Sequence, residues 1–104
     1  MNARISILIL VENGPPILGV GIQQDDHEKI LALAESLHSQ SIVKISDFFQ
    51  HVRFEIDELP KLLEEISAMI ANNSDAHLAH LLDEMRKNVV LAMEHKSPLL
   101  ALAP

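Results

Sequence analysis

The sequence predicts an α+β fold, in which a mostly antiparallel sheet of about four strands packs against helices. Near the middle of the chain the apolar residues change period, from every second residue at Val52, Phe54 and Ile56 to a helical spacing from Leu59 onward. Short β-branched segments precede this change, and long amphipathic segments follow it. A length of 104 residues fits one domain, and the absence of cysteine rules out disulfide bonds within it.

The first two elements are predicted to be strands joined by a loop. Residues 5–11 carry isoleucine, leucine and valine on both faces, which is typical of a central strand covered on both sides. Residues 12–16, Glu-Asn-Gly-Pro-Pro, favour a turn. Residues 17–22 form the returning strand, and Gly19 and Gly21 are expected on one face of it, where a helix or another backbone approaches closely.

The middle of the chain is predicted to contain one helix and two further strands. The helix begins at Asp25, which has the spacing of an N-terminal cap, and ends near Ser39. Residues 42–45 form a short third strand, and residues 51–56 form the fourth. The turn between them, at residues 46–50, holds two phenylalanines that we expect to be tucked inward.

The last third of the chain is predicted to be a helical hairpin followed by an apolar tail. Asp57 caps a helix that runs to Ala71, and Ser74 caps a second helix that ends near His95. The short link between these helices forces them to be antiparallel. Residues 97–104 fit three roles, namely an added edge strand, a flap over the helices or a sticky tail. The apolar stripes of the hairpin predict that Leu63, Ile66 and Leu82 are buried.

The acidic residues gather in two segments of the chain. The net charge is −7 with histidine neutral, which makes nucleic acid and anionic membranes poor partners. Residues 25–35 carry four acids against one lysine, and residues 47–65 carry six acids against one arginine and one lysine. Each segment is either a solvated face or a surface for a basic partner. In the second segment, the candidate partner-binding residues are Asp47, Glu55, Asp57, Glu58, Glu64 and Glu65.

Glu64 and Glu65, which are adjacent in the second acidic segment, can be interpreted either as part of a solvated face or as part of a surface for a basic partner. Adjacent helix positions point about 100° apart, so these two groups cannot act together as an acid/base pair. We expect both on the solvated side of their helix. Reversing both to lysine should therefore leave stability within about 0.5 kcal/mol and, if the surface binds a partner, slow association.

No catalytic or metal-binding motif is present in the sequence, and we predict no enzyme activity, no metal and no cofactor. Two of the histidines, His77 and His80, lie one helical turn apart, but two ligands are too few for a metal site. His51 has polar neighbours on its strand and is the centre of the alternative interpretation, a small enzyme or ligand-binding domain with a pocket nearby. The six histidines are His27, His38, His51, His77, His80 and His95.

The sequence contains no secretion signal and no membrane-spanning segment, and this favours a cytoplasmic location. Residues 1–11 have a single basic residue and a short apolar run without a small-residue cleavage site, which is unlike a secretion signal. No apolar run approaches the roughly 20 residues that span a bilayer. We therefore expect no membrane partner.

The order of these parts resembles the small acidic immunity proteins of bacterial polymorphic toxin systems. The resemblance rests on the turn at residues 12–15, on Ile-Leu-Gly-Val-Gly at residues 17–21, and on Glu-Leu-x-x-Leu-Leu-x-Glu-Ile at residues 58–66. It implies an intracellular protein that binds and blocks one cognate toxin and performs no chemistry of its own. A toxin acting on nucleic acid or nucleotides would present a basic cleft to the acidic surface. A self-associating module, forming a homodimer through residues 97–104, is the second alternative.

Overall fold

Alternate residues of the first strand are isoleucines that point into the core. In the computed structural model, which describes residues 3–104, β1 spans Arg4–Ile9, and Ile5, Ile7 and Ile9 are all buried. Ser6 and Leu8 point to the opposite face of the sheet and are half-buried. The first strand is therefore packed on one side only, rather than covered on both sides as expected.

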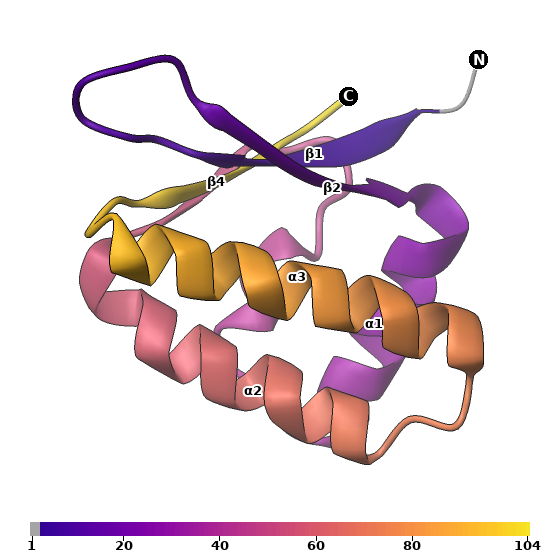
Figure 1. Ribbon diagram of the computed structural model, residues 1–104. Helices are drawn as coiled ribbons and strands as arrows, with labels where there is room; N and C mark the ends of the chain where they lie inside the picture. The colour runs from indigo at the N-terminus through magenta and orange to yellow at the C-terminus, as the bar shows by residue number, and fades with distance from the viewer. Residues whose placement is uncertain (1–2) are drawn as a thin grey trace.

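The strands form one antiparallel sheet with the order β2-β1-β4-β3. Strand β2 spans Ile17–Gln23, β3 spans Val52–Phe54 and β4 spans Leu99–Leu102. The helices lie on one side of this sheet, as Figure 1 shows. The predicted α+β class, with an antiparallel four-stranded sheet against helices, is confirmed.

The C-terminal segment is a central strand of the sheet. Strand β4 pairs with β1 on one side and with β3 on the other, and it buries Leu99 and Ala101 in the core. None of the three roles predicted for residues 97–104 is therefore correct. The expectation failed because a strand at the end of a chain can still fill the centre of an antiparallel sheet, and periodicity does not reveal pairing partners.

The helical elements are α1 (Gln24–Ser36), α2 (Leu59–Ala71) and α3 (Ala76–Glu94), with two short 3-10 helices, η1 (Ile42–Ile45) and η2 (Ile56–Glu58). Helices α2 and α3 form the predicted antiparallel hairpin (Figure 1). They lie side by side beneath the sheet, and the short link near Asn73 connects them.

Residues 42–45 are not the predicted third strand but the 3-10 helix η1. In a strand, Lys44 would share a face with Ile42, whereas in a 3-10 helix residues three apart share a face. Ile42 and Ile45, three residues apart, are each 2% exposed, and Lys44 is exposed. The division of this segment into buried and exposed residues therefore follows the helical period and not the strand period.

All three α-helix starts differ from the predicted caps. The carboxylate of Glu58 accepts the N–H of Glu55 at 2.7 Å, so the start signal for η2 and α2 lies at Glu55 rather than at Asp57. At the start of α3, Asp75 rather than Ser74 accepts two amides of the first turn. Helix α1 begins one residue earlier than predicted and has no side-chain cap.

The two glycines of β2 lie on opposite faces, which corrects the expectation that they share one. The pairing register with β1 shifts between Ser6 and Leu8, so β2 carries an extra residue there. A Cβ on Gly19 would lie 2.5 Å from the Oδ1 atom of Asn88 in α3, and a Cβ on Gly21 would lie 2.8 Å from the Arg4 side chain. The Asn88 oxygen accepts the N–H of Val20 at 2.9 Å, so α3 approaches β2 closely at Gly19.

The core between the sheet and the hairpin allows a stability test of the packing. Ile66 and Leu82 are buried as predicted, whereas Leu63 is only partly buried at the edge of the core. We expect Ile66→Ala to lower the free energy of unfolding by about 2–5 kcal/mol and Leu63→Ala to lower it less. Chemical denaturation followed by circular dichroism measures both; equal losses would mean that the packing of α2 is wrongly described.

Candidate partner-binding surface

Four of the six acidic residues predicted to bind a partner flank the edge strand β3 in the chain, and the other two lie on α2. Asp47 belongs to the turn before this strand, Glu55 directly follows it, and Asp57 and Glu58 belong to η2. Glu64 and Glu65 lie on α2. Of these six carboxylates, Glu65 is buried and Glu58 is half-buried. The other four are exposed, namely Asp47, Glu55, Asp57 and Glu64.

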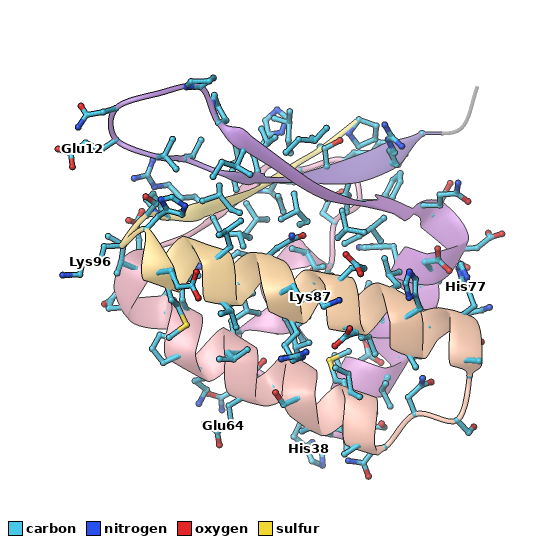
Figure 2. All side chains as sticks on the ribbon, viewed as in Figure 1. Glu12, His38, Glu64, His77, Lys87 and Lys96 are labelled. Atoms are coloured by element: carbon cyan, nitrogen blue, oxygen red, sulfur yellow. The ribbon has the colours of Figure 1, made fainter. Side chains whose placement is uncertain are left out.

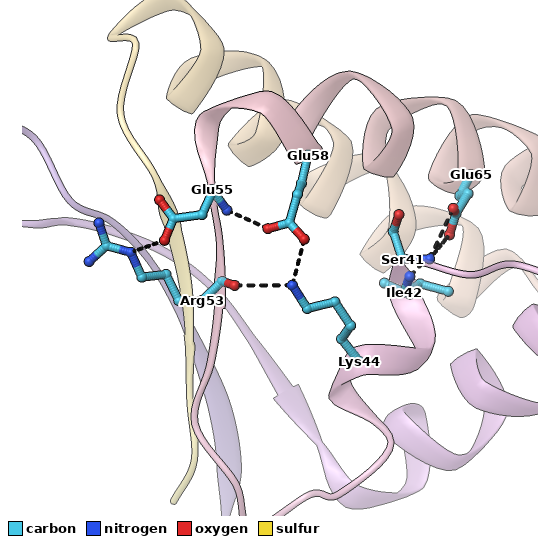
Figure 3. A network of polar contacts seen from close by, with 7 residues as sticks. All are labelled: Ser41, Ile42, Lys44, Arg53, Glu55, Glu58 and Glu65. Carbon is cyan, nitrogen blue, oxygen red and sulfur yellow. Dashed lines mark hydrogen bonds and ion pairs between the residues drawn. The ribbon is translucent and has the colours of Figure 1, made fainter.

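Two of these carboxylates form ion pairs within the protein (Figure 3). The Nε atom of Arg53 lies 2.6 Å from a carboxylate oxygen of Glu55. The Nζ atom of Lys44 lies 2.7 Å from a carboxylate oxygen of Glu58, and this hydrogen bond is the main reason that the pKa of Glu58 is lowered. Lys44 also donates to the carbonyl oxygen of Arg53 at 3.3 Å. The charges of Glu55 and Glu58 are therefore offset locally.

Glu65 does not lie on the solvated face that the sequence predicted. Its side chain is 9% exposed, and its carboxylate accepts the N–H groups of Ser41 and Ile42 at 3.0 Å (Figure 3). It thereby caps the start of η1 from the neighbouring helix α2. A signal for this was present, because Glu65 falls between Leu62 and Met69 on the apolar stripe.

Three exposed carboxylates keep uncompensated negative charge. Among residues 3–104, Asp47, Asp57 and Glu64 take part in no ion pair. Asp47 accepts the N–H of Phe49 at 2.9 Å, which shapes the turn but leaves its charge exposed. These three residues define the acidic part of the surface from here on.

Two large apolar side chains are exposed beside this acidic surface. Phe49 is 70% exposed and Ile56 is 48% exposed, one before and one after β3. The sequence predicted both phenylalanines of the turn to be tucked inward, but only Phe48 is buried; Phe49 stacks edge-on against it at 5.2 Å. We give the name β3-edge surface to Asp47, Phe49, Ile56 and Asp57, which flank β3 in the chain, together with Glu64 from α2.

A polar cleft adjoins Glu64. It has a volume of about 240 Å³ and lies between α2 and the loop that follows α1, with His38, Gln40, Lys61 and Glu64 in its lining. Figure 2 shows His38 and Glu64 on the side of the molecule that faces away from the sheet. The cleft is large enough for one long side chain of a partner, and its lining offers both donors and acceptors.

Two histidines make contacts that tie elements of the fold together. The Nδ1 atom of His51 accepts the N–H of Ala103 at 2.9 Å, which joins the start of β3 to the end of the chain. The Nε2 atom of His77 lies 3.2 Å from a carboxylate oxygen of Asp26, which joins α3 to α1. Both contacts give these residues a structural role.

His27 is a buried polar residue that the sequence analysis did not single out. It is 4% exposed, its Nε2–H group donates to the carbonyl oxygen of Ile45, and its ring meets Phe48 edge-on at 5.2 Å. It occupies the same helix face as the buried Ile30 and Ala34, and this spacing was the available signal. Its contact anchors η1 to α1.

Within the described part of the chain, no three histidine, aspartate or glutamate side chains gather where they could hold a metal ion. No helix between residues 3 and 104 is both long enough and apolar enough to span a bilayer. The chain matches no protein-family model, no curated protein sequence and no solved structure. The arrangement therefore defines a small α+β domain whose β3-edge surface combines exposed carboxylates with exposed apolar side chains.

Proposed function

We propose that this protein is a cytoplasmic inhibitor, like the immunity proteins it resembles, that binds and blocks one cognate bacterial toxin. The β3-edge surface would enter a basic cleft of the toxin and occupy it in place of the substrate. The protein would need no cofactor and would perform no reaction.

The observation that carries this proposal is that Phe49 and Ile56 are exposed in the same acidic segment of the chain as the unpaired carboxylates Asp47, Asp57 and Glu64. Three large apolar side chains are exposed in the described chain, and two of them, Phe49 and Ile56, lie in the acidic segment. Buried aromatic anchors surrounded by polar groups supply most of the binding energy in protein interfaces. A face that served only to keep the protein solvated would not require an exposed phenylalanine there.

The charge of the surface supports a basic partner. Asp47, Asp57 and Glu64 have no internal counter-charge, so a positive cleft would gain their attraction without breaking an existing ion pair. Opposite charge on the partner would also speed the encounter, and salt would weaken this effect. Glu55 and Glu58 contribute less, because Arg53 and Lys44 already offset them.

The two alternatives from the sequence are supported less well. A catalytic role for His51 would compete with its hydrogen bond to the N–H of Ala103. A homodimer through residues 97–104 would have to use the outward side chains of β4, because both backbone edges of this strand are already paired.

The proposal predicts that Phe49 is an anchor for the partner. The product of the gene next to that of this protein should be captured by it, and Phe49→Ala should weaken the complex at least tenfold, or about 1.4 kcal/mol. Leu18→Ala is the matched control, since Leu18 is 69% exposed against 70% for Phe49 but lies on β2, whereas Phe49 lies in the turn before β3. Calorimetry on the purified pair measures both variants. Failure to capture that product, or equal affinity for all three proteins, would refute the proposal.

A further inference from the structure

The sheet of this protein is open, and its two outer strands have one strand neighbour each. Within the residues that the structure describes, β2 pairs only with β1, and β3 pairs only with β4. The free edge of an outer strand presents backbone N–H and C=O groups to which an extended segment of another chain can add. The groups that lie against each edge therefore decide whether the sheet can extend into a second chain.

The free edge of β3 is occupied by Lys44 from η1 (Figure 3). Its Nζ atom donates to the carbonyl oxygen of Arg53, the middle residue of β3, at 3.3 Å. Successive residues of an antiparallel strand direct their backbone groups to opposite edges, so this carbonyl is one that β4 leaves free. The same Nζ atom lies 2.7 Å from a carboxylate oxygen of Glu58 and 4.9 Å from the centre of the Phe54 ring.

Lys44 is held at this edge because η1 is anchored by two helices. Glu65 of α2 accepts the N–H of Ile42 at 3.0 Å, and His27 of α1 donates to the carbonyl oxygen of Ile45. These contacts hold the residues on both sides of Lys44 in the chain. The positive charge at the edge of β3 is therefore positioned by the fold.

The free edge of β2 is occupied by Asn88 from α3. The N–H of Val20, which lies where the register with β1 shifts, donates to the Oδ1 atom of Asn88 at 2.9 Å. Gly19 provides the space for this contact, because a Cβ there would lie 2.5 Å from the same oxygen. The bulge and the inserted side chain both interrupt the row of backbone groups that a new strand would need.

We propose that Lys44 and Asn88 protect the two edges of the sheet and thereby prevent copies of this chain from pairing edge to edge. Protection matters most at β3, because Phe49 and Ile56 are exposed on either side of it in the chain. A free strand edge next to exposed apolar side chains is a site for aggregation. This edge protection is independent of the proposed function, since it depends only on contacts within one chain.

Sedimentation equilibrium of the full chain, from low micromolar to millimolar concentration, tests this proposal. We expect the unchanged protein to be a monomer over this range. Lys44→Met and Asn88→Ala should each associate at concentrations at least tenfold below its upper limit. Lys44→Met should fold normally, because an ion pair between partly exposed side chains contributes little to stability. Gly19→Ala is a second variant for the edge of β2, since its added methyl group displaces the Asn88 oxygen.

Two controls separate an open edge from other causes. Lys29→Met also removes a lysine that forms an ion pair, but on α1, where Lys29 lies 3.6 Å from Asp75. Both lysine variants make the chain more negative by one charge, which opposes association. Asn88→Asp keeps an oxygen that can accept the N–H of Val20. Both controls should stay monomeric.

Three results would overturn the proposal. A folded variant that stays monomeric up to millimolar concentration would show that the replaced side chain does not protect its edge. Association of Lys29→Met as strong as that of Lys44→Met would show that the loss of a lysine, and not an open edge, is the cause. Oligomers of the unchanged protein that grow with concentration would show that its edges are not protected.

Discussion

Deleting residues 99–104 should prevent this protein from folding. The deletion removes β4, which lies between β1 and β3 and supplies Leu99 and Ala101, 2% and 1% exposed, to the core. Without β4 the strand β3 loses the only partner that the sheet order gives it, and β1 gains an open edge. The loss of one central strand exceeds the marginal stability of a domain of this size.

Far-UV circular dichroism and the dispersion of amide signals in NMR spectra measure this effect. Removal of Pro104 alone is the control, because this residue is exposed and lies beyond β4. A truncated chain that still unfolds cooperatively at the original denaturation midpoint would show that β4 is dispensable. That outcome would favour the flap or the sticky tail, two of the three roles that the sequence left open for residues 97–104.

Glu65→Ala should destabilise the protein by about 2–4 kcal/mol, although the residue is a glutamate on a surface helix. The substitution leaves the N–H groups of Ser41 and Ile42 without the carboxylate that accepts them in a buried place. Hydrogen bonds to a charged group contribute more than neutral ones, and unsatisfied buried amides add a further penalty. The start of η1 should loosen together with this contact.

Glu64→Ala is the matched control, since it removes the same group from the exposed side of the same helix and should change stability by less than about 0.5 kcal/mol. Chemical denaturation of both variants compares the two positions. The expectation that reversal of both residues leaves stability unchanged is therefore wrong for Glu65, which is buried, and stays a prediction for Glu64. Equal, small losses would mean that Glu65 is solvated and that η1 is not capped by it.

The periodicity of the chain was sufficient to predict the fold class and the helical hairpin. Leu59, Leu62, Ile66 and Met69 recur at helical spacing, and all four are buried on α2. Such patterns depend on which side of an element faces the core, and this is encoded locally. The burial of the alternating isoleucines of β1 is likewise encoded locally, by the strand period.

The elements that were predicted wrongly depend on contacts distant in the sequence. Residues 42–45 form a 3-10 helix with the help of Glu65, which lies more than 20 positions away. Strand β4 takes its place through pairing with a strand at the other end of the chain. A pattern of apolar residues contains no information on either partner.

The candidate site was predicted in part. The acidic segment was visible from composition, but composition could not separate Glu65, which is buried, from Glu64, which is exposed. Nor could it show that Phe48 turns inward while Phe49 turns outward, since both residues belong to an irregular turn without a period. The apolar part of the β3-edge surface therefore became visible only in three dimensions.

The association rate of this protein with the product of the neighbouring gene tests most directly whether the β3-edge surface binds a basic partner. Stopped-flow mixing at low and high salt would compare Glu64→Lys with Glu94→Lys, which reverses an exposed charge at the end of α3. We predict that Glu64→Lys slows association several-fold at low salt, that Glu94→Lys has little effect, and that salt removes the difference. Equal rates for both variants, independent of salt, would contradict a role for this surface in binding.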